Sequence, residues 1–228
     1  AAIHYIDVAQ EYGLAGDVCP MPEAEAGVSI DDDAPILGCC AVQCNTTCDG
    51  SLLSNGVISK RMEFEDGIPV FQLAAPLRHT NDDVQDYAAQ EIRNAIAFIE
   101  EHTGEKWDWK YYFECAKRVN YATKCRLEWL EMSTSPYPQV YGSTLALYTE
   151  TNYMAISGRL PVFEETDRKI MKLAEKAYKK KKMAANEYRH RAIVWGVQSH
   201  FYMDFLVWLL NCWGIVPLTD MLSMDNTK

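Results

Sequence analysis

Residues 35–73 read PILGCCAVQCNTTCDGSLLSNGVISKRMEFEDGIPVFQL, and their pattern predicts the first part of the fold. Two short apolar runs, Ile36–Val42 and Ile68–Leu73, favour buried strands. A helix is expected to begin near Asp49, because Asp and Thr are favoured N-cap residues. Strand, helix and strand in this order form a βαβ unit with two parallel strands.

The segments that follow these strands are candidates for a site. Ligands of parallel α/β sheets bind outside the carboxyl ends of the strands. The loop Cys44–Cys48 follows the first predicted strand, and Pro76–His79 follows the second. We therefore expect both segments to lie at the edge where a ligand would bind.

The cysteines point to metal or redox chemistry. Eight cysteines in 228 residues are too few for a disulfide-stapled secreted domain. Cys19, Cys44 and Cys48 lie in polar or proline-interrupted loops, which indicates exposed thiols, and no paired C-x2-C pattern of a zinc site is present. The others fall in strand or helix patterns and are expected to pack as small apolar side chains: Cys39, Cys40, Cys115, Cys125 and Cys212.

Three domains are predicted. Residues 1–80 form a Rossmann-like α/β domain with a parallel sheet, 81–188 a helical module, and 189–228 the start of a second α/β domain. The last part is shorter than the roughly 50 residues that a domain needs, so we expect the second domain to be truncated. Because residue 1 is not methionine, we also expect the natural start to be missing.

Within the helical module, Gly104 is expected to end one helix and Asp108 to begin the next. The apolar side of this second helix is predicted to carry Trp109, Phe113, Ala116, Thr123, Leu127 and Leu130. In the final part, a strand–helix–strand pattern is expected to leave an apolar surface and to cause self-association. The side chains of this surface are Trp195, Phe205, Leu209 and Trp213.

Charge and hydropathy narrow the class of protein. The net charge of −10 argues against nucleic-acid binding. The chain shows no signal-peptide pattern at its start and no run of about 18 apolar residues, so we expect a cytoplasmic protein without a membrane partner. The basic run Lys179–Lys182 is interpreted as a solvated helix face.

Several motifs carry a family resemblance: GDVCPMPEAEAG, CNTTCDG, GIPVFQLAAPLRH, YAAQEIRNAIAFIEEHTGEKWDW and RAIVWGVQSHFYMDFLVWLLNCWGIVP. With them the chain resembles subunits of the 2-hydroxyacyl-CoA dehydratase family, which also contains benzoyl-CoA reductases. Within the family it is most similar to the larger subunit of members that act on 2-hydroxyglutaryl-CoA. The resemblance covers essentially all of the chain.

The resemblance implies a 4Fe-4S cluster held by three cysteines, two from the first α/β domain and one from the second. Carried over, Cys19 and Cys48 are the matching ligands, and Cys44 is the reserve candidate. The third ligand has no match in this chain.

The resemblance also implies a reaction. Water is eliminated from an (R)-2-hydroxyacyl-CoA, with 2-hydroxyglutaryl-CoA favoured, to give the (E)-2-enoyl-CoA through a ketyl radical. The implied partners are a second subunit, an ATP-hydrolysing iron-sulfur activator and the acyl-CoA, with a flavin in the heterodimer as an open alternative. Asp17 and His79 are the polar groups expected nearest the substrate, and Arg78 is the candidate for binding a carboxylate or a CoA phosphate.

Other interpretations stay open at this point. Asp17 could cap its loop, and His79 and Arg78 could be surface residues. The chain could be an electron-relay subunit, a subunit of an aromatic acyl-CoA reductase, or a non-catalytic metal-binding redox protein that uses Cys44 and Cys48.

Overall fold

A computed structural model of the chain describes residues 2–31, 38–44, 48–74, 76, 81–139, 160–183, 187–195 and 204–220. The chain divides into two compact units, Ala1–Trp107 and Asp108–Lys228. The predicted division into three domains at residues 80 and 188 concerns independent folding and stays a prediction.

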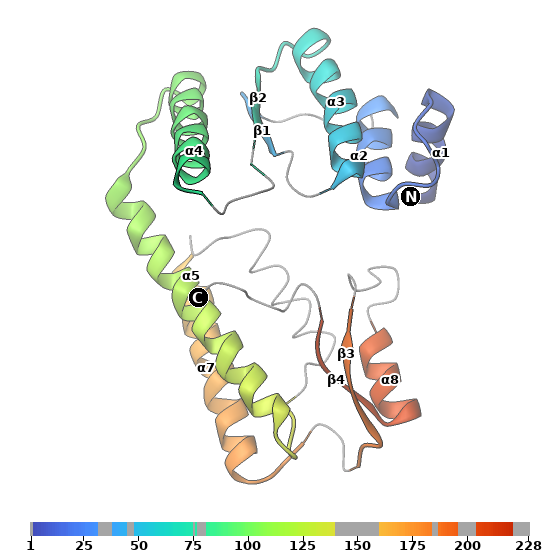
Figure 1. Cartoon of the computed structure of the whole chain (residues 1–228), viewed down its shortest axis with the longest axis vertical. Coiled ribbons are helices and arrows are strands. Elements are labelled where there is room, and N and C mark those ends of the chain that lie inside the picture. Colours follow the sequence, from blue (N-terminus) through green and yellow to red (C-terminus); the bar gives the residue numbers. More distant parts are fainter. Residues whose placement is uncertain are drawn as a thin grey trace. The chain divides into compact units, whose positions relative to one another are not determined.

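The first unit begins with two packed helices, α1 (Ala2–Tyr12) and α2 (Pro20–Asp31) (Figure 1). Small residues at their contact allow the backbones to approach closely. Ala9 and Ala26 are fully buried, and a Cβ atom built on Gly27 would lie 1.8 Å from the Tyr5 carbonyl oxygen. Only glycine fits at position 27 without separating the helices.

The predicted βαβ unit is present. Strands β1 (Ala41–Cys44) and β2 (Val70–Leu73) pair in parallel, and α3 (Asp49–Phe64) connects them. The strand β1 starts later than the sequence predicted. Its ladder begins where the Ala41 N–H donates to the Pro69 carbonyl over 3.0 Å, and Pro69 has no N–H to continue the ladder toward the N-terminus.

Helix α3 packs against α2, which lies between α3 and α1 in Figure 1. Val57 contacts the buried cluster formed by Ala9, Leu14 and Ala26. A short turn with Gly67 in the left-handed region, at φ 66°, then leads to β2.

Helix α4 (Asp82–Thr103) completes the first unit and contacts β2. The rings of Phe71 and Phe98 lie 5.5 Å apart between centroids. The helix ends at Gly104, which has φ 73°, so the predicted stop is confirmed.

In the second unit, α5 (Trp109–Thr134) packs against α7 (Pro161–Lys179). The predicted start of α5 is confirmed, because the Asp108 carboxylate accepts a 3.0 Å hydrogen bond from the Tyr111 N–H. The predicted apolar side is wrong. The core at the α5–α7 contact consists of Cys125, Trp129, Met171 and Ala174.

The bulky residues predicted to face that core are exposed instead, among them Trp109, Phe113 and Leu127. The buried stripe of α5 combines the small residues Ala122, Cys125 and Ser133 with one large aromatic residue, Trp129. The basic run Lys179–Lys182 is exposed as predicted, but the predicted helix face is wrong, because α7 ends at Lys179 and the next three lysines follow the helix.

A second parallel pair follows, with β3 (His190–Val194), α8 (Phe205–Trp213) and β4 (Ile215–Asp220). The register shifts between Ala192 and Ile193, beside Pro217, which offers no N–H to the ladder. Trp195 and Trp213 are 78% and 54% exposed. Phe205 and Leu209 are half-buried, so only the two tryptophans of the expected set are largely exposed, and the expected apolar surface and self-association stay predictions.

The α/β character is confirmed by these two parallel strand pairs. Within the described ranges each sheet has two strands and most residues are helical, so a larger Rossmann-like sheet is not seen there.

Candidate metal centre

The two leading thiols each lie directly before a helix. Cys19 is exposed, and its carbonyl accepts from the Glu23 N–H over 3.5 Å in the first turn of α2. Cys48 is half-buried and is the N-cap of α3, with φ −135° and ψ 117°, and its carbonyl accepts from the Leu52 N–H over 3.1 Å.

The first turns of α2 and α3 are in contact. A Cβ atom built on Gly50 would lie 3.3 Å from Cγ of Pro22 and 3.5 Å from Sγ of Cys48. Pro22 is the third residue of α2, and Gly50 is the second residue of α3. The structure therefore brings the residues that follow Cys19 against the residues that follow Cys48.

The other cysteines near β1 differ from expectation. Cys44 is exposed and is the last residue of β1 rather than a loop residue, and its carbonyl accepts from Nδ2 of Asn55 over 3.1 Å. Cys39 and Cys40 precede the strand, and Cys39 is exposed, so the expectation that both pack within a strand is wrong. The pKa of Cys40 is raised by burial and by the neighbouring Cys39 thiol.

The cysteines of the second compact unit also differ in burial. Cys125 is buried in the core, as predicted, and its burial raises the pKa of the thiol. Cys115 is half-buried in α5. Cys212 was expected to pack inside α8 but is exposed.

The predicted polar site residues are only partly placed. Asp17 is exposed in the turn between α1 and α2, two residues before Cys19. Arg78 and His79 lie outside the described residues.

A buried carboxylate next to Cys19 was missed by sequence reasoning. Glu23 is 2% exposed, and its Oε1 accepts from Nε2 of Gln10 over 3.4 Å. The same Nε2 would lie 3.0 Å from a Cβ atom on Gly16. The side chain of Gln10, a residue of α1, thus contacts both the turn that carries Asp17 and Cys19 and the first turn of α2. Burial of Glu23 has no signature in its local sequence.

Polar side chains join α3 to the strands. Oε1 of Gln43 accepts from the Ser59 hydroxyl over 2.5 Å and from Nε2 of Gln72 over 2.6 Å. Together with the hydrogen bond from Asn55 to the Cys44 carbonyl, these contacts fix the carboxyl end of β1, from which the chain continues to Cys48.

The thiols before α2 and α3 are of the chemical type that binds iron-sulfur clusters. Thiolates are the usual ligands of such clusters. Helix N-termini favour negative charge, and Cys19 and Cys48 each precede one. In the described ranges, no group of three or more His, Cys, Asp or Glu side chains is placed to hold a metal. A three-thiolate site would therefore need a ligand from elsewhere.

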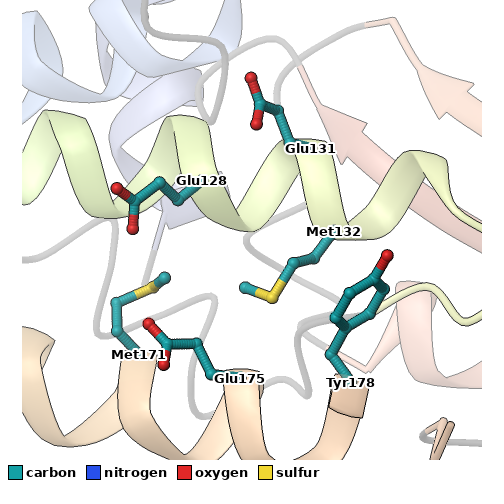
Figure 2. A pocket seen from close by; sticks show the side chains of 6 residues that line it. All are labelled: Glu128, Glu131, Met132, Met171, Glu175 and Tyr178. Carbon is teal, nitrogen blue, oxygen red and sulfur yellow. The ribbon is translucent and has the colours of Figure 1, made fainter.

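One pocket lies between α5 and α7, with a volume of about 370 Å³ (Figure 2). Its lining residues are Glu128, Glu131, Met132, Met171, Glu175 and Tyr178. Two of its carboxylates already face lysines, with Lys124 3.7 Å from Glu128 and Lys179 3.9 Å from Glu175. No thiol lines this pocket, and it contributes nothing to the candidate metal centre.

A comparison with protein families identifies the chain. The model of the family described as 2-hydroxyglutaryl-CoA dehydratase, D-component, matches residues 1–226. The chain belongs to this family. The resemblance expected from the motifs is thereby confirmed, and the family consists of dehydratase subunits. A search of curated proteins gives no match. Among the residues that the structure describes, no helix is long and apolar enough to span a membrane.

Proposed function

We propose that the chain is a subunit of an oxygen-sensitive dehydratase that eliminates water from an (R)-2-hydroxyacyl-CoA to give the (E)-2-enoyl-CoA. The main support is the contact between the first turns of α2 and α3, each of which follows one candidate thiol. In this proposal Cys19 and Cys48 ligate a 4Fe-4S cluster, and the third cysteine comes from outside the described residues. 2-Hydroxyglutaryl-CoA is the favoured substrate, in agreement with the family description.

The cluster would supply one-electron chemistry. The β-proton of the substrate is not acidified by an adjacent carbonyl, and general acid–base catalysis, worth roughly 10² to 10⁴-fold, does not overcome that barrier. Reduction of the thioester carbonyl to a ketyl would allow the α-hydroxyl to leave and would acidify the β-carbon. Loss of the β-proton to a base would then give the ketyl of the enoyl thioester, which would return the electron. No net electron is consumed.

The chain's own residues would then bind the substrate and handle protons. Asp17, exposed beside Cys19, is the candidate for proton transfer near the substrate, together with His79. Arg78 is the candidate for holding a carboxylate or a CoA phosphate. Gln10 and Glu23 would hold the turn that carries Asp17 and Cys19.

The assembly is part of the proposal. A second dehydratase subunit and an ATP-hydrolysing iron-sulfur activator would complete the enzyme in the cytoplasm, with a flavin as an open alternative. The β1–β2 pair would belong to a larger Rossmann-like sheet, and β3–β4 to the sheet of a second α/β domain.

Activity with a panel of substrates tests the proposal. Anaerobically purified protein with its partner subunit, activator and ATP should convert 2-hydroxyglutaryl-CoA to the enoyl-CoA faster than lactoyl-, phenyllactoyl- or benzoyl-CoA. Preferential reduction of benzoyl-CoA would assign the chain to an aromatic acyl-CoA reductase. Zinc in stoichiometric amount without acid-labile sulfide would contradict both assignments.

A further inference from the structure

Cys39 and Cys40 form an adjacent pair of thiols in the first compact unit. Both are reduced, and Cys39 is exposed while Cys40 is half-buried. They lie outside the helices and directly before Ala41, the first residue of β1. The proposed function assigns no role to either thiol, although one of them is open to solvent.

The backbone bends at Cys39 and brings the two side chains together. A Cβ atom built on Gly38 would lie 3.2 Å from the carbonyl oxygen of Cys40, so the bend is tight and glycine suits its start. The two thiols are in hydrogen-bond contact, and the pKa of Cys40 is raised by burial first and then by the neighbouring Cys39 thiol. The bend therefore holds two sulfur atoms at one place, with one of them accessible.

The pair is separate from the next thiol along the chain. Cys44 lies at the far end of β1, three residues or about 10 Å beyond Ala41. A disulfide needs Cα atoms within about 7 Å of each other. The partner within reach of Cys39 is thus Cys40.

A bond within this pair would be strained. Neighbouring Cα atoms lie about 3.8 Å apart, which is closer than the usual range for a disulfide. Strained disulfides are reduced more easily than structural ones, so such a bond is reversible. Ala41 makes the first hydrogen bond of the β1–β2 ladder, and the bend before it can therefore change without breaking a ladder bond.

We propose that Cys39 and Cys40 form a reversible redox site, at which hydrogen peroxide converts the two thiols into a disulfide. The exposed Cys39 reacts first, and its sulfur takes one oxygen atom from the peroxide to give a sulfenic acid and water. The sulfur of Cys40 then attacks the sulfur of Cys39, the S–O bond breaks, and a second water leaves with the proton of Cys40. The thiols lose two electrons to the peroxide, and a dithiol reductant reverses the change.

The site is independent of the proposed function, since neither thiol is a candidate cluster ligand. An accessible thiol next to a second one is the arrangement found in redox-sensing cysteines. The exposed Cys212 has no cysteine beside it in the chain, so it provides the matched comparison.

Peptide mapping of the full chain, purified anaerobically and treated with an equimolar amount of hydrogen peroxide, tests the proposal. After alkylation of the remaining thiols, the fragment with Cys39 and Cys40 should lack two hydrogens and should regain them with dithiothreitol. Cys40→Ser should stop at the sulfenic acid, which dimedone traps on Cys39. Cys39→Ser should form no disulfide in this fragment, and Cys212→Ser should behave as the wild type.

Three results would overturn the proposal. The first is a wild-type fragment in which both thiols are still alkylated, or in which Cys39 is a sulfinic acid without a disulfide. The second is a disulfide from either residue to Cys44. The third is the absence of a dimedone adduct on Cys39 in Cys40→Ser.

Discussion

The two βαβ units of the chain share a backbone plan and differ in chemistry. In each, two parallel strands are joined through a helix, and a left-handed glycine, Gly67 or Gly214, turns the helix into the second strand. The first βαβ unit joins β1, α3 and β2 through the hydrogen-bonded side chains of Gln43, Ser59 and Gln72. The second contains the aromatic helix α8, with Trp208 and Trp213 in contact at 5.9 Å between ring centroids.

Their surroundings differ as well. The first βαβ unit is flanked by α1 and α2, and the turn between those helices carries Cys19 and Asp17. In the second unit, the described thiol is Cys212, which lies within α8 rather than before it. The parallel pair alone therefore does not create a metal centre. The difference lies in thiols that precede helices which pack together.

The largest loss of stability is expected from Gly27→Ala, because this variant disrupts the close packing of α1 and α2 beside the first βαβ unit. The new Cβ would meet the Tyr5 backbone at 1.8 Å, so α1 and α2 must separate. We expect the free energy of unfolding to fall by at least about 3 kcal/mol, the upper end of the usual cost of overpacking. Anaerobic chemical denaturation measures this. An unchanged midpoint would show that the two helices do not pack this closely.

Next in size is the loss of the Gln10–Glu23 contact. Glu23→Ala removes a buried carboxylate and should cost about 1–3 kcal/mol, since the Gln10 amide loses its acceptor. Glu23→Gln keeps an acceptor oxygen and should lose less. Glu25→Ala, at an exposed position of the same helix, is the control for denaturation and iron content. Equal losses in the Glu23 and Glu25 variants would remove the proposed role of Glu23.

A smaller loss of stability is expected from alanine at the two left-handed glycines, and the two variants compare the turns directly. Gly67→Ala places alanine in the left-handed region with nothing within 4 Å, so it should cost about 1–2 kcal/mol. Gly214→Ala carries the same strain and also crowds the Arg189 backbone nitrogen at 3.4 Å, so it should cost more. Thermal unfolding of both variants tests the order. The reverse order would show that the contact with Arg189 does not add to the cost at Gly214.

The smallest effect is a gain. Gly56 lies inside α3, and a Cβ there has open space around it. Gly56→Ala should therefore stabilise the chain by about 0.5–1 kcal/mol through the unfolded state and helix propensity. A loss of stability in this variant would indicate a contact of α3 outside the described residues.

Local signals in the sequence predicted much of the fold. The βαβ pattern around Cys48 follows from short apolar runs, and the start of α5 at Asp108 and the end of α4 at Gly104 follow from capping residues, all of which act over a few residues. The expectation that Asp or Thr caps α3 is wrong, because its N-cap is Cys48, which makes no side-chain cap hydrogen bond. The loops of Cys19 and Cys48 were placed for the same reason.

Features that depend on a distant partner were not predicted. The buried side of α5 follows α7, which covers Cys125 and Trp129 and leaves Trp109 exposed. The contact of Gly27 with Tyr5 and the burial of Glu23 likewise depend on how α1 meets α2. Periodicity identifies an apolar side but not the helix that covers it.

The most direct test of the account is the iron and acid-labile sulfide content of cysteine variants of the anaerobically purified enzyme. Cys19→Ala and Cys48→Ala should each abolish the brown absorbance of the cluster. Cys115→Ala, and Cys212→Ala at the exposed thiol of the second βαβ unit, should retain the wild-type content. Full iron and sulfide in Cys48→Ala, or their loss in Cys212→Ala, would contradict the assignment of the metal centre to the first turns of α2 and α3.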